Sequence, residues 1–373
     1  MSHPREVILD ARWLRTGIGR YTLTLLRELK PNLPDALLTC ITMPAHVKAV
    51  APLCDRVIEM SCGIYSLAEQ AQLPFVARNA AVFCAPHYNI PVFRTGSLVV
   101  TIHDLTHLIF PEYRRRLHAR LYAEAMLRFA CMRAVRVVTP SKYTKRMLVE
   151  HLKADPEKIS VVPCAVNPLF RPRDKGQAAG EVRNSLDIQA PYILFVGSMA
   201  PHKNLLTLLT AYRQLRARRR DMPPLVSVLP KKIKASTVGS MQLMPGVRCL
   251  HAVDDRSLAS LYAAASMTVV PSFEEGFGLP VIESMASGTP VICSDAASLP
   301  EIAGDAAIYC SPRSPEAMAA AIEQVLDSQS LQQSLAAAGI KSAARFSAHR
   351  GAAAYATLLS SITGSRRPEG AMQ

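Results

Sequence analysis

The chain has 373 residues, of which 49% are hydrophobic and 19% are charged, so it is long enough for two domains and too apolar to be disordered. No stretch approaches the ~18 uninterrupted apolar residues of a membrane-spanning helix, and the first residues lack the apolar segment of a signal peptide. The nine cysteines stand singly without a Cys-x-x-Cys pair, which disfavours zinc sites and disulfides and predicts a cytoplasmic protein.

The formal net charge of +14 is concentrated in one region. Residues 114–146 hold ten basic side chains against one acidic side chain, Glu124. Such a patch attracts phosphate groups on anionic lipid or nucleic acid. Because basic and aromatic residues do not interleave, we expect no nucleic acid and favour a membrane surface, with an ordinary solvated helix as the alternative. The basic residues proposed for this contact are Arg114, Arg115, Arg116 and Arg120.

The first predicted elements are a strand at 6–10, a loop at 12–19 and a helix at 20–29. The loop ends in Gly-Ile-Gly, but Tyr21 and Thr22 follow instead of the third glycine that a dinucleotide fingerprint requires. This spacing disfavours a dinucleotide-dependent oxidoreductase.

Further strands are predicted at 38–43, 56–60, 81–84 and 97–102, alternating with helices as in a parallel α/β sheet. Polar residues follow two of these strand ends, where open α/β sheets bind ligands. His87 and His103 are the candidates there, although either histidine could equally be an ordinary packing residue.

The remainder of the first half is predicted as a long helix at 113–134, a strand at 135–139, a helix near 143 capped by Ser141, and a strand at 159–163. The polar segment after it, 167–190, is predicted to form the hinge.

The second half repeats the strand and helix alternation. Asp254 and Asp255 look superficially like a metal pair, but they precede a helical pattern and are better interpreted as its cap. No His/Cys cluster with metal-ligand spacing is present, so we expect no metal. A buried strand at 267–271 then leads through a glycine-bearing loop into a helix that begins near Pro280 and ends at Gly288.

That strand, loop and helix form a candidate phosphate site. A helix N-terminus attracts anions, and Gly276 and Gly278 allow a phosphate to approach the backbone. Glu275 and Glu283 flank the site and could accept hydrogen bonds from sugar or ribose hydroxyls. An ordinary glycine-rich turn with two solvated glutamates is the alternative.

The same stretch carries a family resemblance. EGFGLPVIESMASGTPV, starting at Glu275, resembles the signature of the retaining glycosyltransferases of family 4, and SLPEIAGDAAIY (298–309) and DDRSLASLYAAASMTVVPS (254–272) fit that family too. The resemblance implies a GT-B fold of the α/β class, with two Rossmann-like doubly wound domains facing across a cleft. The implied domains are an acceptor-binding domain at 1–170, a hinge at 171–190 and a nucleotide-sugar domain at 191–346, with helix 347–363 packing back on the first domain.

The resemblance also implies roles. Glu275 faces the donor sugar, Glu283 binds the ribose, and Lys203, within GSMAPHKN (197–204), neutralises the departing diphosphate. Ser198 stands where the family often has an arginine, with His202 or Arg20 as candidate replacements. The implied catalytic residues are Glu275, His103 and Lys203. The implied donor-binding residues are Gly17, Gly19, Ser198, Lys203, Val253, Glu275, Gly276, Phe277, Gly278, Leu279 and Glu283. His87 joins the four arginines as an acceptor or membrane residue.

GIGRY, ending at Tyr21, is similar to mannosyltransferases of bacterial surface-polysaccharide assembly. It favours GDP-mannose as the donor and a lipid-linked saccharide as the acceptor, at the inner face of the cell membrane, with no cofactor. The alternatives are a UDP-sugar-dependent transferase, an epimerase that separates UDP from N-acetylglucosamine, and a non-enzymatic nucleotide-sugar binding protein.

Overall fold

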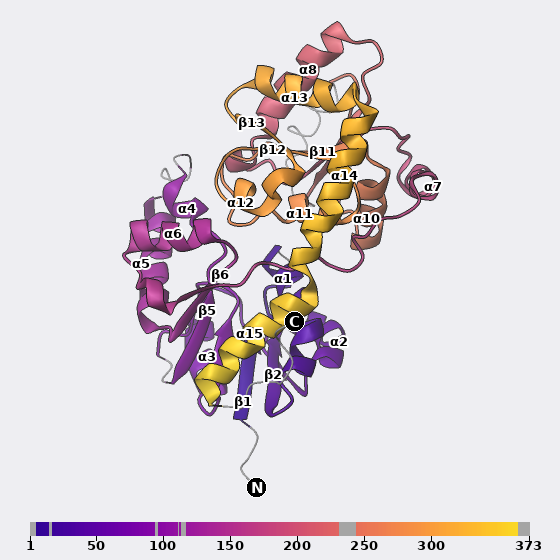
Figure 1. Cartoon of the computed structure of the whole chain (residues 1–373). Coiled ribbons are helices and arrows are strands. Elements are labelled where there is room, and N and C mark those ends of the chain that lie inside the picture. Colours follow the sequence, from indigo (N-terminus) through magenta and orange to yellow (C-terminus); the bar gives the residue numbers. More distant parts are fainter. Residues whose placement is uncertain are drawn as a thin grey trace. The chain divides into compact units, whose positions relative to one another are not determined.

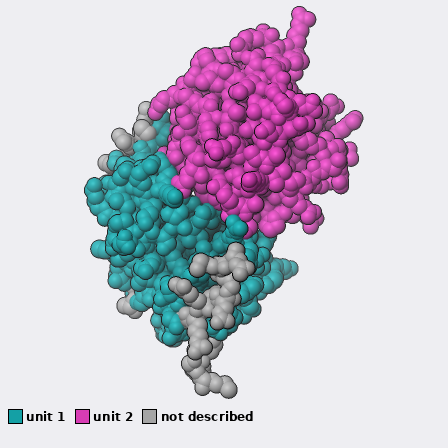
Figure 2. Space-filling view, in the orientation of Figure 1, with its two compact units in different colours: residues 1–165, 348–373 teal, residues 166–347 magenta. Residues whose placement is uncertain are grey.

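The computed structural model describes residues 5–14, 17–93, 96–110, 112, 117–230 and 244–364 (Figure 1). The chain divides into two compact units, coloured separately in Figure 2. Unit 1 comprises Met1–Ala165 and Ala348–Gln373, and unit 2 comprises Val166–Ser347.

Unit 1 is built on a seven-stranded, entirely parallel sheet in the order β3-β2-β1-β4-β5-β6-β7. Its inner strands are apolar and buried on both faces, as a sheet covered by helices on both sides requires. The strands are β1 (Arg5–Asp10), β2 (Ala36–Thr42), β3 (Arg56–Glu59), β4 (Val82–Ala85), β5 (Ser97–Thr101), β6 (Arg136–Thr139) and β7 (Ile159–Val161).

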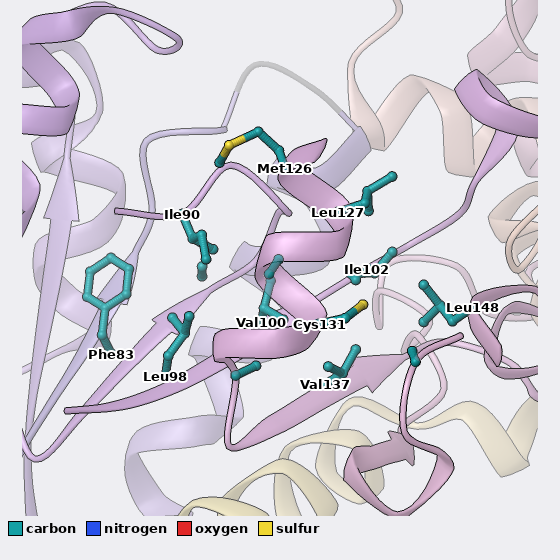
Figure 3. Close-up of a cluster of buried hydrophobic side chains, with 14 of the residues drawn as sticks. Phe83, Ile90, Leu98, Val100, Ile102, Met126, Leu127, Cys131, Val137 and Leu148 are labelled. Atoms are coloured by element: carbon teal, nitrogen blue, oxygen red, sulfur yellow. The ribbon is translucent and has the colours of Figure 1, made fainter. Parts of the chain in front are cut away.

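The core of unit 1 lies between β4, β5, β6 and the helix that covers them, as Figure 3 shows. Phe83, Val100, Leu127 and Val137 meet there and are almost completely buried. The α-helices of unit 1 are α1 (Gly17–Leu29), α2 (Val47–Val50), α3 (Leu67–Val76), α4 (Thr106–Ile109), α5 (Leu117–Arg133), α6 (Lys142–Leu152) and α15 (Ala348–Thr363). Ser141 caps α6 by accepting a hydrogen bond from the Thr144 amide, as predicted.

One boundary in unit 1 corrects the sequence prediction. Gly17 and Gly19, expected in a loop, lie in the first turn of α1, which packs against α15. Gly19 is buried, and a Cβ there would overlap the backbone of Leu14. Glycine is therefore needed at position 19 because the helix approaches the preceding turn closely. Since glycine has a low helix propensity, the sequence predicted a loop where α1 begins.

Unit 2 contains a six-stranded parallel sheet in the order β10-β9-β8-β11-β12-β13. Both sheets therefore have the doubly wound pattern that the sequence predicted. The strands are β8 (Ile193–Val196), β9 (Leu225–Leu229), β10 (Val247–His251), β11 (Met267–Val270), β12 (Val291–Ser294) and β13 (Ile308–Cys310). The α-helices are α7 (Lys175–Leu186), α8 (Leu205–Arg218), α10 (Asp255–Ala264), α11 (Leu279–Ala286), α12 (Leu299–Ala303), α13 (Pro315–Leu326) and α14 (Gln329–Ala343).

The range 171–190, predicted as a hinge, is mostly occupied by α7, which belongs to unit 2. Asp174 caps this helix by accepting a hydrogen bond from the Gln177 amide at 2.8 Å. Ala178 and Val182 are its buried residues, and α7 packs against α10. Because only these two residues of α7 are buried, the sequence showed little helical periodicity there, and the segment was predicted to be a hinge.

Candidate functional site

The loop between β11 and α11 is shaped by glycine. Gly278 precedes α11 with a φ of 95°, and a Cβ there would lie 2.5 Å from Leu299 Cδ2, so a side chain would be strained and crowded. Pro280 occupies the first turn, where its missing N–H is not needed. Gly288 ends the helix region with a φ of 73°. The predicted strand, glycine loop and helix are therefore confirmed.

Glu275 and Lys203 form an ion pair in this loop region. Lys203 Nζ lies 2.7 Å from Oε1 and 2.8 Å from Oε2 of Glu275, so the ammonium engages both carboxylate oxygens. Ser272 Oγ donates to Glu275 Oε1 at 2.7 Å, and Ser298 Oγ donates to the Glu275 main-chain oxygen at 2.9 Å. Glu275 is only 9% exposed, and both its carboxylate and its backbone are held by named donors.

The loop that carries Lys203 is tied to the loop that carries Glu275. Asn204 has a φ of 57°, and its Nδ2 donates to the main-chain oxygens of Pro271 at 2.8 Å and Pro312 at 2.7 Å. The Phe273 amide donates to the His202 main-chain oxygen at 2.8 Å. These bonds fix the two loops together at the carboxyl ends of β8 and β11, where doubly wound sheets bind ligands.

Glu283 lies within α11 as predicted and is almost completely buried. Tyr262, on α10, donates its hydroxyl to Glu283 Oε2 at 3.1 Å. This hydrogen bond fixes the orientation of the carboxylate, because water does not compete for either group in a buried site.

The other predicted donor residues of unit 2 are placed differently from one another. Phe277 is buried and meets Phe346 edge to face with the ring centroids 5.4 Å apart, so its side chain is part of the packing. Ser198 Oγ accepts from the Ala200 amide at 3.3 Å. Val253 is half-buried in the turn between β10 and α10. Gly276 is buried and Leu279 half-buried beside it at the start of α11.

His103 follows β5 in unit 1. Its Nε2 lies 3.0 Å from the Pro86 carbonyl oxygen, which can only accept, so Nε2 carries the proton and the lone pair of the neutral ring is on Nδ1. The Tyr21 ring contacts it edge to face at 4.8 Å. Burial lowers the pKa of His103, so the ring is held neutral.

His87 is stacked between two aromatic rings, Trp13 at 4.1 Å and Tyr88 at 4.0 Å between centroids. The Asn89 amide donates to His87 Nδ1 at 3.2 Å. Burial lowers the pKa of His87 to about 3, because the charged ring would lose its hydration. His87 therefore offers an acceptor or donor edge but no positive charge near neutral pH.

The basic helix is described only in part. Arg114, Arg115 and Arg116 lie outside the described residues, and Arg120 is half-buried on α5. Gly17 of α1 is exposed, with no atom within 4 Å of where a Cβ would stand. No helix in the described ranges is long and apolar enough to cross a membrane.

Three serine and asparagine contacts were missed by sequence reasoning. Ser272, Ser298 and Asn204 hold Glu275 or its neighbouring loop. Each lies inside or beside a quoted motif, which was the available signal, but their partners are distant in the chain.

Two family models match most of the chain. Residues 181–342 match the model described as glycosyl transferases group 1, and residues 72–169 match glycosyltransferase family 4. The chain is 31% identical over 275 residues to O-antigen chain mannosyltransferase B of Escherichia coli, covering 71% of this chain and 70% of that protein. It is 30% identical over 251 residues to the O-antigen chain mannosyltransferase RfbU of Salmonella typhimurium, covering 66% and 65% respectively.

Solved structures share the fold at low identity. The sucrose-phosphate synthase of Thermosynechococcus elongatus has a TM-score of 0.77 at 21% identity, covering 96% of this chain and 99% of that one. WaaG, a glycosyltransferase involved in lipopolysaccharide biosynthesis, has a TM-score of 0.72 at 16% identity, covering 96% and 100%. The chain therefore has the GT-B fold, with one parallel sheet in each unit.

Proposed function

The chain belongs to glycosyltransferase family 4, and we propose that it transfers mannose from GDP-mannose to a saccharide acceptor with retention of configuration at the anomeric carbon. Its mannose-transferring relatives support the choice of sugar. The observation that carries the proposal is the Lys203–Glu275 pair beside the glycine loop that opens α11. It places a cation, a carboxylate and a helix N-terminus together, which are the groups that a sugar diphosphate would engage.

In this proposal the N-terminus of α11 and Lys203 bind the diphosphate. Negative charge grows on that group as the bond to the sugar breaks, and an ammonium bound to it stabilises that charge more strongly in the transition state than in the ground state. Without donor, the ammonium is neutralised by Glu275. Binding of a diphosphate would draw Lys203 toward phosphate and leave the Glu275 carboxylate to accept a hydrogen bond from a sugar hydroxyl. Ser272 would keep that carboxylate oriented.

Glu283 would hold the ribose hydroxyls of the nucleotide, with Tyr262 fixing its carboxylate. The peptides of Gly276 to Leu279 would line the sugar and phosphate, and Val253 would lie near the base. The acceptor proton would leave through the departing phosphate, with Nδ1 of the neutral His103 as an assisting base. The proposal needs no metal and no cofactor, because Lys203 and the helix N-terminus supply the charge neutralisation.

The proposed acceptor is a lipid-linked saccharide, met at the cytoplasmic face of the cell membrane. The strongly basic run 114–146 supports this, since anionic lipid attracts clustered Lys and Arg side chains at ~1 kcal/mol each. Three apolar side chains of α5 are also exposed in the described part of the helix: Leu121, Tyr122 and Met132.

The donor is tested by incubating the protein with a panel of nucleotide-sugars and a saccharide acceptor, and measuring which nucleoside diphosphate is released. We expect GDP from GDP-mannose. Release of UDP would replace the proposed donor with a UDP-sugar, and formation of an epimer without acceptor would replace the transfer reaction itself. Proton NMR of the product's anomeric signal tests retention.

A further inference from the structure

Unit 1 contains a cavity of about 490 Å³ beside the carboxyl ends of β1 and β2. Its volume lies within the ~300–1,000 Å³ of typical small-molecule sites. The loop after β1 supplies one wall, the turn after β2 a second, and the segment before α3 a third. The apolar and aromatic lining residues are Trp13, Met43, Pro44, Ala45, Ile64 and Tyr65.

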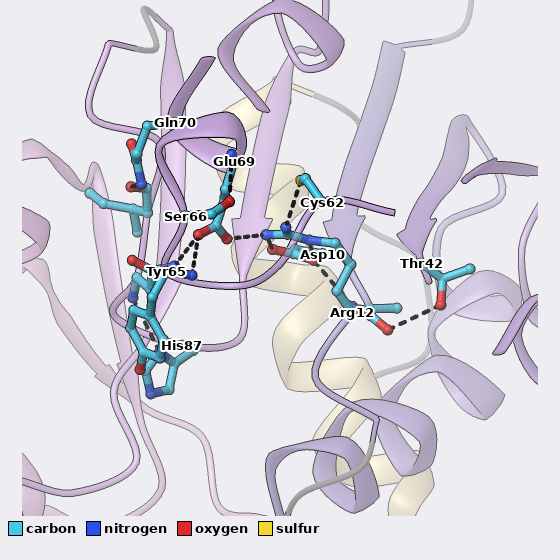
Figure 4. Close-up of polar contacts among 12 residues, drawn as sticks. Asp10, Arg12, Thr42, Cys62, Tyr65, Ser66, Glu69, Gln70 and His87 are labelled. Carbon is cyan, nitrogen blue, oxygen red and sulfur yellow. Dashed lines mark hydrogen bonds and ion pairs between the residues drawn. The ribbon is translucent and has the colours of Figure 1, made fainter. Parts of the chain in front are cut away.

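Arg12 also lines the cavity, but its guanidinium forms ion pairs with Asp10 and Glu69 in a buried network (Figure 4). Its guanidinium donates to both oxygens of Asp10, at 2.8 and 2.7 Å, and to Glu69 Oε1 at 2.6 Å. The Arg12 side chain is 0% exposed, and those of Asp10 and Glu69 are 2% and 0% exposed. The remaining nitrogen, Nη1, has a longer contact of 3.9 Å with Cys62 Sγ. Because buried ions are stable only when they are paired, Asp10 and Glu69 keep the Nε and Nη2 donors inside the network and away from a ligand's hydroxyls.

The same network shapes the cavity wall. Glu69 Oε2 accepts from the Tyr65 amide at 2.7 Å and from Asn89 Nδ2 at 2.9 Å. Tyr65 has a φ of 66°, a left-handed conformation that costs a residue with a side chain roughly 1 kcal/mol or more and that the Glu69 hydrogen bond offsets. The Tyr65 ring is thereby set against Trp13, with the centroids 5.5 Å apart.

Apolar surface continues from the cavity. Tyr65 is 50% exposed and Leu67, two residues further on, is 91% exposed. The Tyr65 ring also lies 6.0 Å from the ring of Tyr122 on α5, which is itself 44% exposed. On a monomeric protein, a large contiguous apolar patch often marks a binding site.

We propose that this cavity receives a segment of hydrocarbon chain, that of the lipid on which the saccharide acceptor is carried. A saccharide in the same place would need hydrogen-bond partners for its hydroxyls, and burying them without partners is costly. Besides Arg12, the polar groups of the lining side chains are His46, the Trp13 indole N–H and the Tyr65 hydroxyl, which are few for a saccharide with several hydroxyls. The inference rests on the proposed function, because it names the lipid part of the proposed acceptor.

The chain's single tryptophan provides the test, since Trp13 lines the cavity. Trp13 emission is recorded while the full-length protein is titrated with geraniol, with decanol or with mannose. We expect a saturable emission change with the two alcohols and none with mannose, and tighter binding of geraniol or of decanol distinguishes an isoprenoid from a straight chain. No saturable change with either alcohol, or a saturable change with mannose, would overturn the proposal.

Two matched variants locate the response. Ala45→Phe places a ring in the cavity and should weaken alcohol binding by about tenfold or more. Ala49→Phe, on an exposed position of α2 outside the lining, should titrate like the unmodified protein. Equal alcohol affinities in the two variants would contradict the assignment, and thermal unfolding of both confirms that they are folded.

Measuring donor turnover distinguishes a failure of the cavity assignment from a failure of the proposed transferase function. GDP release from GDP-mannose is measured with a saccharide acceptor that lacks a lipid. A protein that releases GDP but does not respond to either alcohol retains the proposed function and loses the cavity assignment. A protein that binds the alcohols but releases no GDP loses the donor proposal.

Discussion

Lys203 Nζ sits almost equidistant from the two carboxylate oxygens of Glu275, at 2.7 and 2.8 Å, although the two residues are 72 positions apart in the chain. The pair is partly shielded, with 22% of the lysine side chain and 10% of the glutamate side chain exposed. Removing either partner therefore has a double effect, because it deletes one group and leaves the other without its counter-charge.

Replacing Lys203 by Met should lower turnover by ~10²–10³-fold, the usual effect of removing one group that stabilises transition-state charge. Lys203→Arg should retain part of the activity, since the charge remains but its shape changes. Steady-state GDP release measures both effects. Lys341→Met, at an exposed position of α14, is the control and should behave like the unmodified protein. Full turnover in Lys203→Met would remove the lysine from the mechanism.

Glu283→Ala should weaken nucleotide binding, measured by calorimetric titration with GDP, because the ribose would lose its carboxylate partner. Tyr262→Phe should produce a smaller loss of GDP affinity, since it deletes only the hydroxyl that orients Glu283. The binding free energy of GDP should weaken by no more than ~0.5–1.5 kcal/mol, the usual contribution of one hydrogen bond. Unchanged GDP affinity in Glu283→Ala would show that the carboxylate serves only the packing of α11.

Stability should fall as the pH decreases below the ordinary histidine pKa. The pKa of His87 is lowered to about 3, so between pH ~6.5 and about 3 the unfolded chain binds a proton that the folded chain does not. The free energy of unfolding should then drop by up to ~1.4 kcal/mol per pH unit for this residue. His103, whose pKa is also lowered, acts in the same direction.

Urea unfolding at pH 7 and pH 5 measures this dependence. His87→Phe preserves the ring between Trp13 and Tyr88 but cannot titrate, so its stability should change less between the two pH values. Asn184→Gln, at an exposed position of α7, adds no titratable group and should leave the pH dependence as it was. An equal pH dependence in the unmodified protein and His87→Phe would show that His87 titrates normally.

Replacing Arg114, Arg115 and Arg116 by Ser should reduce sedimentation with vesicles that contain phosphatidylserine, because three charges that attract anionic lipid are removed. The control replaces Arg213, Arg218 and Arg220, exposed positions of unit 2, and changes the net charge equally. Vesicle binding that falls alike in both triple variants would indicate a general charge effect and not a membrane-binding region.

Local features of the fold were predictable because their causes lie within a few residues. Asp254 was expected to cap a helix, and it accepts from the amides of Arg256 and Ser257. The glycine loop before α11 was also predictable, since glycine accepts the positive φ at position 278 and proline suits the first helical turn at position 280.

Contacts between distant segments were not predictable in the same way. Arg12 and Glu69 are 57 residues apart, and the sequence around each residue does not predict that they form a buried ion pair. The pairing of Lys203 with Glu275 depends on β8 and β11 lying side by side in the sheet. The family resemblance indicated both residues but assigned them to separate groups of the donor, so their mutual bond emerges only from the three-dimensional arrangement.

The role of Glu275 is tested most directly by comparing turnover and GDP affinity in Glu275→Ala. If this carboxylate positions the sugar, GDP release from GDP-mannose in the presence of acceptor should fall by ~10²-fold or more, while the affinity for GDP stays within a few-fold of the unmodified protein. Turnover equal to that of the unmodified protein would contradict the assignment of the Lys203–Glu275 loop region as the catalytic site.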